Sequence, residues 1–171
     1  LNASTRSVAV GGTSGKSTVT GMIGWIASEA GLDPTIMNGA VMRNFAREDS
    51  PFASSRVGHS GLFVSEVDES DGSIALFHPE IAVLNNITLD HKSLEELRHL
   101  FGAFARGASK AIWNADDAES VELMKTLDLA GAVSFGFAEG ADFRAVDVHE
   151  APLSVSFMLE AKGQSLHVGL A

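Results

Sequence analysis

The feature that most limits how this chain can fold is a glycine-rich turn between an apolar run and a helical pattern near its start. Residues 7–10 form a short apolar run that ends in two glycines, and a helix-type apolar spacing extends over residues 16–30. Glycines let the backbone wrap closely around an anion, and the amide groups of the following helix N-terminus then point at it. The turn therefore predicts a strand–loop–helix unit that binds phosphate groups.

Two side chains in this turn suit a nucleoside triphosphate. Lys16 would offset charge on the β- and γ-phosphates, and the hydroxyl of Ser17 would bind Mg²⁺. The common eight-residue pattern has a glycine six positions before the lysine, where this chain has Val10. A simple tight turn is the alternative interpretation, but it leaves unexplained a lysine at a helix start, where the helix dipole disfavours positive charge.

The rest of the chain alternates apolar runs with helical patterns. Apolar runs at residues 62–64, 81–84, 111–113 and 133–135 predict buried strands, and residues 34–37 predict a short one. Helices are predicted from Ser93, with Glu96 completing a capping box, and over residues 119–127. Residues 38–60 predict a loop with one helical turn. This alternation predicts an α/β fold, a mostly parallel sheet with helices on both faces.

The pattern changes after residue 140. Three stretches up to residue 170 alternate apolar and polar side chains, which is typical of an antiparallel meander. A length of 171 residues fits a single domain. We therefore expect one domain over residues 1–171, with a phosphate-binding α/β core at 1–139 and small antiparallel strands at 140–171.

Two groups of polar residues follow predicted strands, where ligands bind in open α/β sheets. Glu66 follows the strand at 62–64, and Asn86, Asp90 and His91 follow the strand at 81–84. Taken alone, Glu66 could belong to a solvated acidic loop, since three more carboxylates lie within five residues of it. A lone histidine after a strand is usually incidental. The residue types by themselves do not decide whether either group binds a ligand or is incidental.

Together the three motifs resemble the Mur ligases. The resemblance lies in Gly12-Thr13-x-Gly15-Lys16-Ser17-Thr18, Glu66-x-Asp68-Glu69-Ser70-Asp71 and Asn86-x-x-x-Asp90-His91, in that order. It implies an ATP-binding central domain in which a carboxylate is activated as an acyl-phosphate for amide formation. It also implies two Mg²⁺ ions, one on Ser17 and one on Glu66 and His91, with Lys16, Glu66 and His91 serving catalysis. The implied ATP-binding residues are Gly12, Thr13, Ser14, Gly15, Lys16, Ser17, Thr18 and Asn86.

The resemblance is greatest to the early branch of the family, which acts on UDP-N-acetylmuramate with L-alanine or an intact peptide as the amine. Later-acting members carry a carbamylated lysine where this chain has Phe101. Asn114-Ala115-Asp116-Asp117 is similar to a family segment, but a strand-end turn with a helix cap explains it equally well. The alternatives are another Mur-like ligase, of polyamino-acid synthetase or folylpolyglutamate synthase type, and a nucleotide-binding module without ligase activity.

Composition argues against some classes of binding partner. With 12 basic against 22 acidic residues the net charge is −10, which argues against nucleic acid or an anionic membrane as a partner. The chain has no cysteine and no apolar run of the ~20 residues that span a bilayer. A cytoplasmic enzyme is the simplest interpretation. Both ends look cut, so we expect the flanking domains of a full ligase to be absent and the isolated chain to be inactive.

Overall fold

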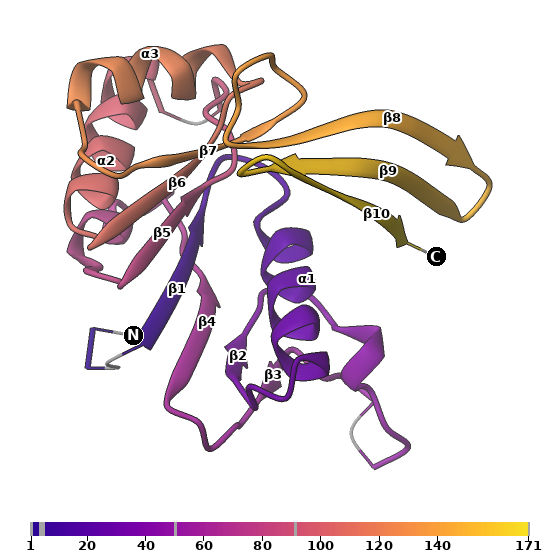
Figure 1. Cartoon of the computed structure of the whole chain (residues 1–171). Helices are drawn as coiled ribbons and strands as arrows, with labels where there is room; N and C mark the ends of the chain where they lie inside the picture. The colour runs from indigo at the N-terminus through magenta and orange to yellow at the C-terminus, as the bar shows by residue number, and fades with distance from the viewer. Residues whose placement is uncertain (1, 4–5, 50, 91, 171) are drawn as a thin grey trace.

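The computed structural model describes residues 2–3, 6–49, 51–90 and 92–170, and it is an α/β fold built on one large sheet (Figure 1). The helices are α1 (Lys16–Glu29), α2 (Leu94–Arg106) and α3 (Ala118–Leu127), with short 3-10 turns η1 (Arg43–Phe45) and η2 (Ser73–Leu76). The strands are β1 (Arg6–Gly11), β2 (Thr35–Met37), β3 (Ser55–Arg56), β4 (Leu62–Glu66), β5 (Ile81–Leu84), β6 (Lys110–Asn114), β7 (Val133–Gly136), β8 (Phe143–Ala151), β9 (Ser154–Ala161) and β10 (Gln164–Leu170).

The sheet has the order β10-β9-β8-β7-β6-β5-β1-β4-β2-β3. Strands from β2 through β4, β1, β5, β6, β7 and β8 pair in parallel, whereas β3, β9 and β10 pair antiparallel with their neighbours. β1 lies between β4 and β5, so the carboxyl ends of these three strands meet at one edge. This arrangement brings together the segments that follow β1, β4 and β5, which carry all three motifs.

Alternation along β1 explains why helices cover both faces. Val8 packs with residues of α1 and β4 on one face, where Leu62 and Val64 are buried. Ala9 points the other way and packs with α2 and α3 through Phe101 and other core residues. Successive side chains on a strand point to opposite faces, so an apolar run such as this one can support a layer of helix on each side. Figure 1 shows α1 apart from the α2–α3 pair.

The predicted fold class is confirmed, and the structure adds two short elements that were not predicted, β3 and η2. The loop predicted over residues 38–60 contains the expected helical turn, as η1, and also the unpredicted two-residue strand β3, which pairs with β2. Arg56 of β3 donates to the Pro34 carbonyl oxygen at 2.6 Å and to Asp33. A strand this short has no period that the sequence could reveal, and it forms because of these long-range contacts. The η2 turn was also not predicted.

The C-terminal strands β8–β10 continue the same sheet rather than forming a separate layer. β8 pairs in parallel with β7 through Phe135–Phe143 and Gly136–Arg144, and then turns into the antiparallel meander. Figure 1 shows β8–β10 as a long curved ribbon that extends beyond the helices. No helix among the residues described is long and apolar enough to cross a membrane.

Candidate functional site

The predicted phosphate loop lies between β1 and α1, as the sequence indicated. Gly12 has φ 144° and Gly15 has φ 75°, and α1 begins at Lys16. A Cβ atom at Gly12 would lie 3.0 Å from the Cβ of Asn85 and 3.1 Å from the backbone nitrogen of Asn86. The positive φ and the close packing both require glycine here. The loop therefore keeps its backbone tightly wrapped at the N-terminus of α1.

The segment after β5 holds this loop in place. The Asn86 side-chain oxygen accepts hydrogen bonds from the Thr13 hydroxyl and from the Ser14 backbone N–H, both at 2.9 Å. Its amide nitrogen donates to the Ser14 carbonyl oxygen at 3.1 Å, and that of Asn85 donates to the same oxygen at 2.8 Å. The Thr88 N–H also donates to the Thr13 hydroxyl at 2.9 Å. Asn86 was predicted to bind ATP, and in this structure its side chain contacts the loop itself.

A second layer of side chains supports the segment after β5. Asn114 donates from its side chain to the Asn85 carbonyl oxygen at 3.0 Å. Asp117 accepts from the Ile87 N–H at 3.0 Å and caps α3 by accepting from the Ser120 N–H at 2.8 Å. The segment at 114–117 is therefore a strand-end turn with a helix cap, as the alternative interpretation predicted. Its capping carboxylate also ties α3 to the residues that hold the phosphate loop.

Lys16 is already engaged by protein groups. Its ammonium donates to the Gly12 carbonyl oxygen at 2.8 Å and to a Glu69 carboxylate oxygen at 3.0 Å. The exposed fractions of the two side chains are 16% for Lys16 and 9% for Glu69, so the ion pair is largely withdrawn from water. In the sequence Glu69 is one of several carboxylates after the strand at 62–64, and its spacing from Glu66 does not predict a contact with Lys16.

The other acidic residues after β4 are satisfied within their own segment. Asp68 accepts the Ser70 N–H at 2.7 Å, and Asp71 accepts the Ser73 N–H at 2.8 Å. The Ser70 backbone N–H, followed by its hydroxyl, holds the pKa of Asp68 below its usual range. The Ser73 hydroxyl and N–H lower the pKa of Asp71 in the same way. Both carboxylates therefore stay ionised without a bound cation.

Glu66 closes β4 and points toward the segment after β2. A Cβ at Gly39 would lie 2.1 Å from one Glu66 carboxylate oxygen, so any other residue at position 39 would force this carboxylate to move. The neighbouring Asn38 donates to the Ser17 carbonyl oxygen at 3.0 Å. Glu66 and Ser17 therefore both border the segment at residues 38–39. The structure brings these two predicted metal ligands to one region, from β4 and the first turn of α1.

The chemistry of these two residues fits a hard divalent cation. One carboxylate oxygen of Glu66 is buried and has no hydrogen-bond partner within the described structure. A buried carboxylate oxygen without a donor is costly unless a cation or water meets it. Carboxylate and hydroxyl oxygens are ligands that Mg²⁺ accepts. His91, the other predicted ligand, lies outside the described residues, and no group of three His, Cys, Asp or Glu residues among those described could hold a metal.

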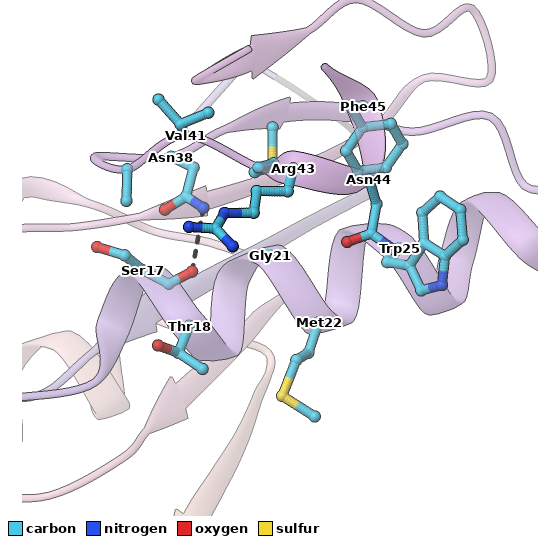
Figure 2. A pocket seen from close by; sticks show the side chains of 12 residues that line it. Ser17, Thr18, Gly21, Met22, Trp25, Asn38, Val41, Arg43, Asn44 and Phe45 are labelled. Carbon is cyan, nitrogen blue, oxygen red and sulfur yellow. Dashed lines mark hydrogen bonds between the residues drawn. The ribbon is translucent and has the colours of Figure 1, made fainter. Parts of the chain in front are cut away.

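A cavity of about 370 Å³ opens beside the first turns of α1 (Figure 2). Ser17 and Asn38 line one end of it, and Figure 2 shows the hydrogen bond that joins them. Trp25 and Phe45 contribute apolar surface, with ring centroids 5.4 Å apart in an edge-to-face arrangement. Arg43 also lines the cavity. The cavity thus adjoins the predicted metal ligand Ser17 with a mixed polar and aromatic wall.

Phe101, which distinguished family branches in the sequence, belongs to the core. Its side chain is completely buried between α2 and the sheet. Its ring lies 3.5 Å from the position of a Cβ added at Gly11, the residue that leads into the phosphate loop. The residue therefore packs beneath the loop.

Comparison with known proteins gives the family. Residues 10–171 match the family described as the Mur ligase middle domain. A UDP-N-acetylmuramate–L-alanine ligase from Trichormus variabilis is 43% identical over 124 residues, which cover 70% of this chain and 24% of that protein. Among solved structures, the UDP-N-acetylmuramate–alanine ligase MurC from Thermotoga maritima has a TM-score of 0.79 at 24% identity, covering 96% of this chain and 36% of its own.

A MurF ligase from Thermotoga maritima, solved in complex with ADP, has a TM-score of 0.71 at 22% identity and covers 96% of this chain and 40% of its own. At these identities the two solved structures show the shared fold. The chain spans about a quarter of the Trichormus relative's length. The family match extends over nearly the whole chain and includes the phosphate loop, Glu66 and the segment after β5. The chain therefore belongs to the Mur ligase family, as a middle domain.

Proposed function

We propose that this chain is the ATP-binding domain of a peptidoglycan-precursor ligase that activates the carboxylate of UDP-N-acetylmuramate. The observation that carries the proposal is the phosphate loop, whose glycines have positive φ and whose lysine begins α1. Such a loop presents backbone N–H groups and a helix N-terminus to an anion. The Thermotoga MurF, which shares this fold, was solved in complex with ADP, and this supports nucleotide binding as part of the proposal.

The proposed reaction has two steps. A carboxylate oxygen of the acceptor attacks the γ-phosphorus of ATP, and ADP leaves as the acyl-phosphate forms. An amine nitrogen then attacks the acyl carbon, phosphate leaves, and the nitrogen loses a proton to give the amide. The first step needs positioning and charge neutralisation more than covalent help from the protein. Here the loop N–H groups would position the phosphates, and Lys16 would offset the charge that develops on them.

Two Mg²⁺ ions belong to this proposal. The Ser17 hydroxyl would hold one, and Glu66 with His91 would hold the other. The unpartnered, buried Glu66 oxygen supports this assignment. Bound there, Mg²⁺ would supply positive charge to the phosphoryl and carboxylate oxygens. His91 binds a metal only when its imidazole is neutral, so metal affinity should weaken below a pKa of normally ~6.5.

The identities of the acceptor and of the amine are a more specific part of the proposal. The name of the Trichormus relative supports UDP-N-acetylmuramate as the acceptor and L-alanine as the amine, and a peptide amine is the alternative. The cavity beside Ser17 is where the acceptor carboxylate could approach the phosphate loop. Because ATP and a nucleotide-sugar are the substrates, we place the reaction in the cytoplasm.

Nucleotide binding is the first test. A fluorescent, non-hydrolysable ATP analogue with Mg²⁺ is titrated into the chain and into Lys16→Met, with Lys125→Met as the matched control. Lys125 is an exposed lysine of α3 whose ion-pair partner, Glu122, lies on the same helix. We expect weak binding to the parent chain and to Lys125→Met, and binding at least tenfold weaker in Lys16→Met. Equal affinity in all three would refute the nucleotide site.

Ligation requires the longer protein. We expect the 171-residue chain alone to release no phosphate in response to alanine or peptide, because the relatives contain much more sequence than this domain. Joining the chain to the flanking segments of a relative and assaying amide formation separates a ligase from a nucleotide-binding module. Amide formation with glutamate on a folate or polyamino-acid acceptor would instead favour another Mur-like ligase.

The metal site has its own test. Glu66→Ala should reduce Mg²⁺-dependent binding of the analogue, and an unchanged Mg²⁺ dependence would refute the two-metal assignment.

A further inference from the structure

The contact between Lys16 and Glu69 has a consequence for nucleotide affinity. Lys16 is the residue that the proposed function assigns to the phosphates, yet its ammonium already donates to the Gly12 carbonyl oxygen and the Glu69 carboxylate. Glu69 lies 53 residues along the chain and reaches the loop because β4 is the neighbour of β1. A carboxylate and a phosphate are both anions with oxygens that accept from an ammonium. Glu69 thus occupies a position on Lys16 that a phosphate oxygen would otherwise take.

We propose that Glu69 is a positioning residue that restrains Lys16 in the nucleotide-free loop and competes with the triphosphate for it. The inference rests on the proposed function, since it requires ATP at this loop. Glu69 differs from the other carboxylates of its segment, because Asp68 and Asp71 accept from serine N–H groups of their own turn. Within the described part of the chain, the Glu69 carboxylate pairs with Lys16 instead.

The burial of the Lys16–Glu69 ion pair determines how strongly Glu69 competes with phosphate for Lys16. With exposed side-chain fractions of 16% and 9%, neither charge is well screened by water. When phosphates draw Lys16 away, Glu69 becomes a nearly buried carboxylate that has lost its partner and faces further negative charge. Breaking this contact therefore opposes ATP binding. Before nucleotide binds, the same carboxylate is favourable, because it offsets a lysine at a helix N-terminus.

Replacing Glu69 by glutamine should separate its effect on nucleotide affinity from its effect on the stability of the chain without nucleotide. Glu69→Gln keeps the size of the side chain and a hydrogen-bond acceptor but removes the charge. We expect the ATP analogue to bind about tenfold more tightly, which corresponds to about 1.4 kcal/mol. Without nucleotide, the variant should melt at a lower temperature than the parent chain. A merely structural glutamate would give lower stability together with unchanged or weaker binding.

Two controls define the comparison. Asp71→Asn removes one negative charge from the same segment and retains an acceptor for the Ser73 N–H, so its analogue affinity should stay within about twofold of the parent. Adenosine, which has no phosphates for Lys16, serves as the matched ligand. Its affinity should be the same in the parent chain and in Glu69→Gln. A similar gain for adenosine, or for Asp71→Asn, would overturn the inference by showing a general effect.

The outcome also distinguishes this inference from the proposed function. If Lys16→Met weakens analogue binding while Glu69→Gln leaves it equal or weaker, the nucleotide site stands and competition by Glu69 is refuted. If Lys16→Met has no effect, the proposed function fails and the inference fails with it. Should Glu69→Gln not fold, Glu69→Asp supplies the same test. Its carboxylate is one methylene shorter, so the contact with Lys16 is weakened and the analogue should again bind more tightly than to the parent.

Discussion

Replacement of Asn86 by alanine tests whether the segment after β5 holds the phosphate loop. The Asn86 side chain makes three hydrogen bonds to the loop, two accepted at 2.9 Å and one donated at 3.1 Å. All three go to Thr13 or Ser14. Alanine removes them and leaves the Ser14 N–H without its side-chain acceptor, while the Ser14 carbonyl keeps only the bond from Asn85. The loop should then sample other conformations before nucleotide binds.

The structure sets the expected size of this effect. An intramolecular hydrogen bond contributes a net ~0.5–1.5 kcal/mol, and less where water can replace the lost partner. Ser14 is exposed, so water reaches its backbone groups, and the lower half of that range applies. For three bonds we expect a loss of about 1.5–3 kcal/mol in the free energy of unfolding. In a chain of this length that lowers the melting temperature by about 3–12 °C.

Nucleotide affinity should fall as well, because binding must now order the loop. An added ordering cost of about 1 kcal/mol corresponds to roughly five- to tenfold weaker binding of the ATP analogue. Thermal melts by circular dichroism and titration of the analogue measure the two quantities. Asn2→Ala is the matched control, since the Asn2 side chain also makes hydrogen bonds to backbone groups, at Leu76 and His78. It should cost stability and leave nucleotide affinity unchanged.

Two results would contradict this reasoning. If Asn86→Ala weakens analogue binding but melts at the parent temperature, Asn86 acts as a direct nucleotide ligand, as the sequence predicted, and not through the loop. If neither quantity changes, the Asn86 hydrogen bonds contribute nothing measurable, and the remaining contacts from Asn85 and Thr88 are enough to hold the loop.

Three further predictions concern the loop, its support and a helix cap. Gly12→Ala should lower stability by about 1–3 kcal/mol and weaken analogue binding, because alanine rarely adopts φ 144°; thermal melts that match the parent would show a relaxed loop. Asp117→Ala should lose the cap of α3 and the acceptor for the Ile87 N–H, costing about 1–3 kcal/mol by chemical denaturation, with weaker analogue binding as the sign of coupling to the loop. The Ser93 N–H, followed by its hydroxyl, holds the pKa of Glu96 below its ordinary value. The capping box therefore stabilises the fold at any pH above the unfolded-state pKa of about 4.5, and this contribution is lost as the pH falls through the lower pKa of the folded state. Melts between pH 6 and 3 should therefore show a smaller acid-induced loss in Glu96→Gln than in the parent, and parallel curves would refute the linkage.

The elements that could be predicted from the sequence are those defined by local patterns. The apolar run before the glycines, the spacing of α1 and the Ser93–Glu96 capping box each depend on residues close together in the chain, and each is present in the structure. The period-two pattern after residue 140 likewise gave the antiparallel strands. Weak local signals failed, as for β3, whose two residues pair only because β2 lies beside them.

The candidate site shows the same division. Residue types and spacing identified the phosphate loop, and placed Glu66 and the segment after β5 at strand ends. They could not show that Asn86 binds the loop, because its contacts to Ser14 join residues 72 positions apart. They also could not distinguish Glu69 from the carboxylates around it. His91 lies outside the described residues, so its role as a metal ligand stays a prediction.

The sequence by itself therefore determined the strand–loop–helix unit, the α/β class and the Mur-type order of motifs, because backbone geometry and side-chain period are local properties. Only the tertiary structure decided which partner each polar side chain of the site contacts. That choice depends on strand order, since placing β1 between β4 and β5 brings Glu69 to Lys16 and Asn86 to the loop. Strand order results from the packing of distant segments against one another, and no local stretch of sequence encodes it.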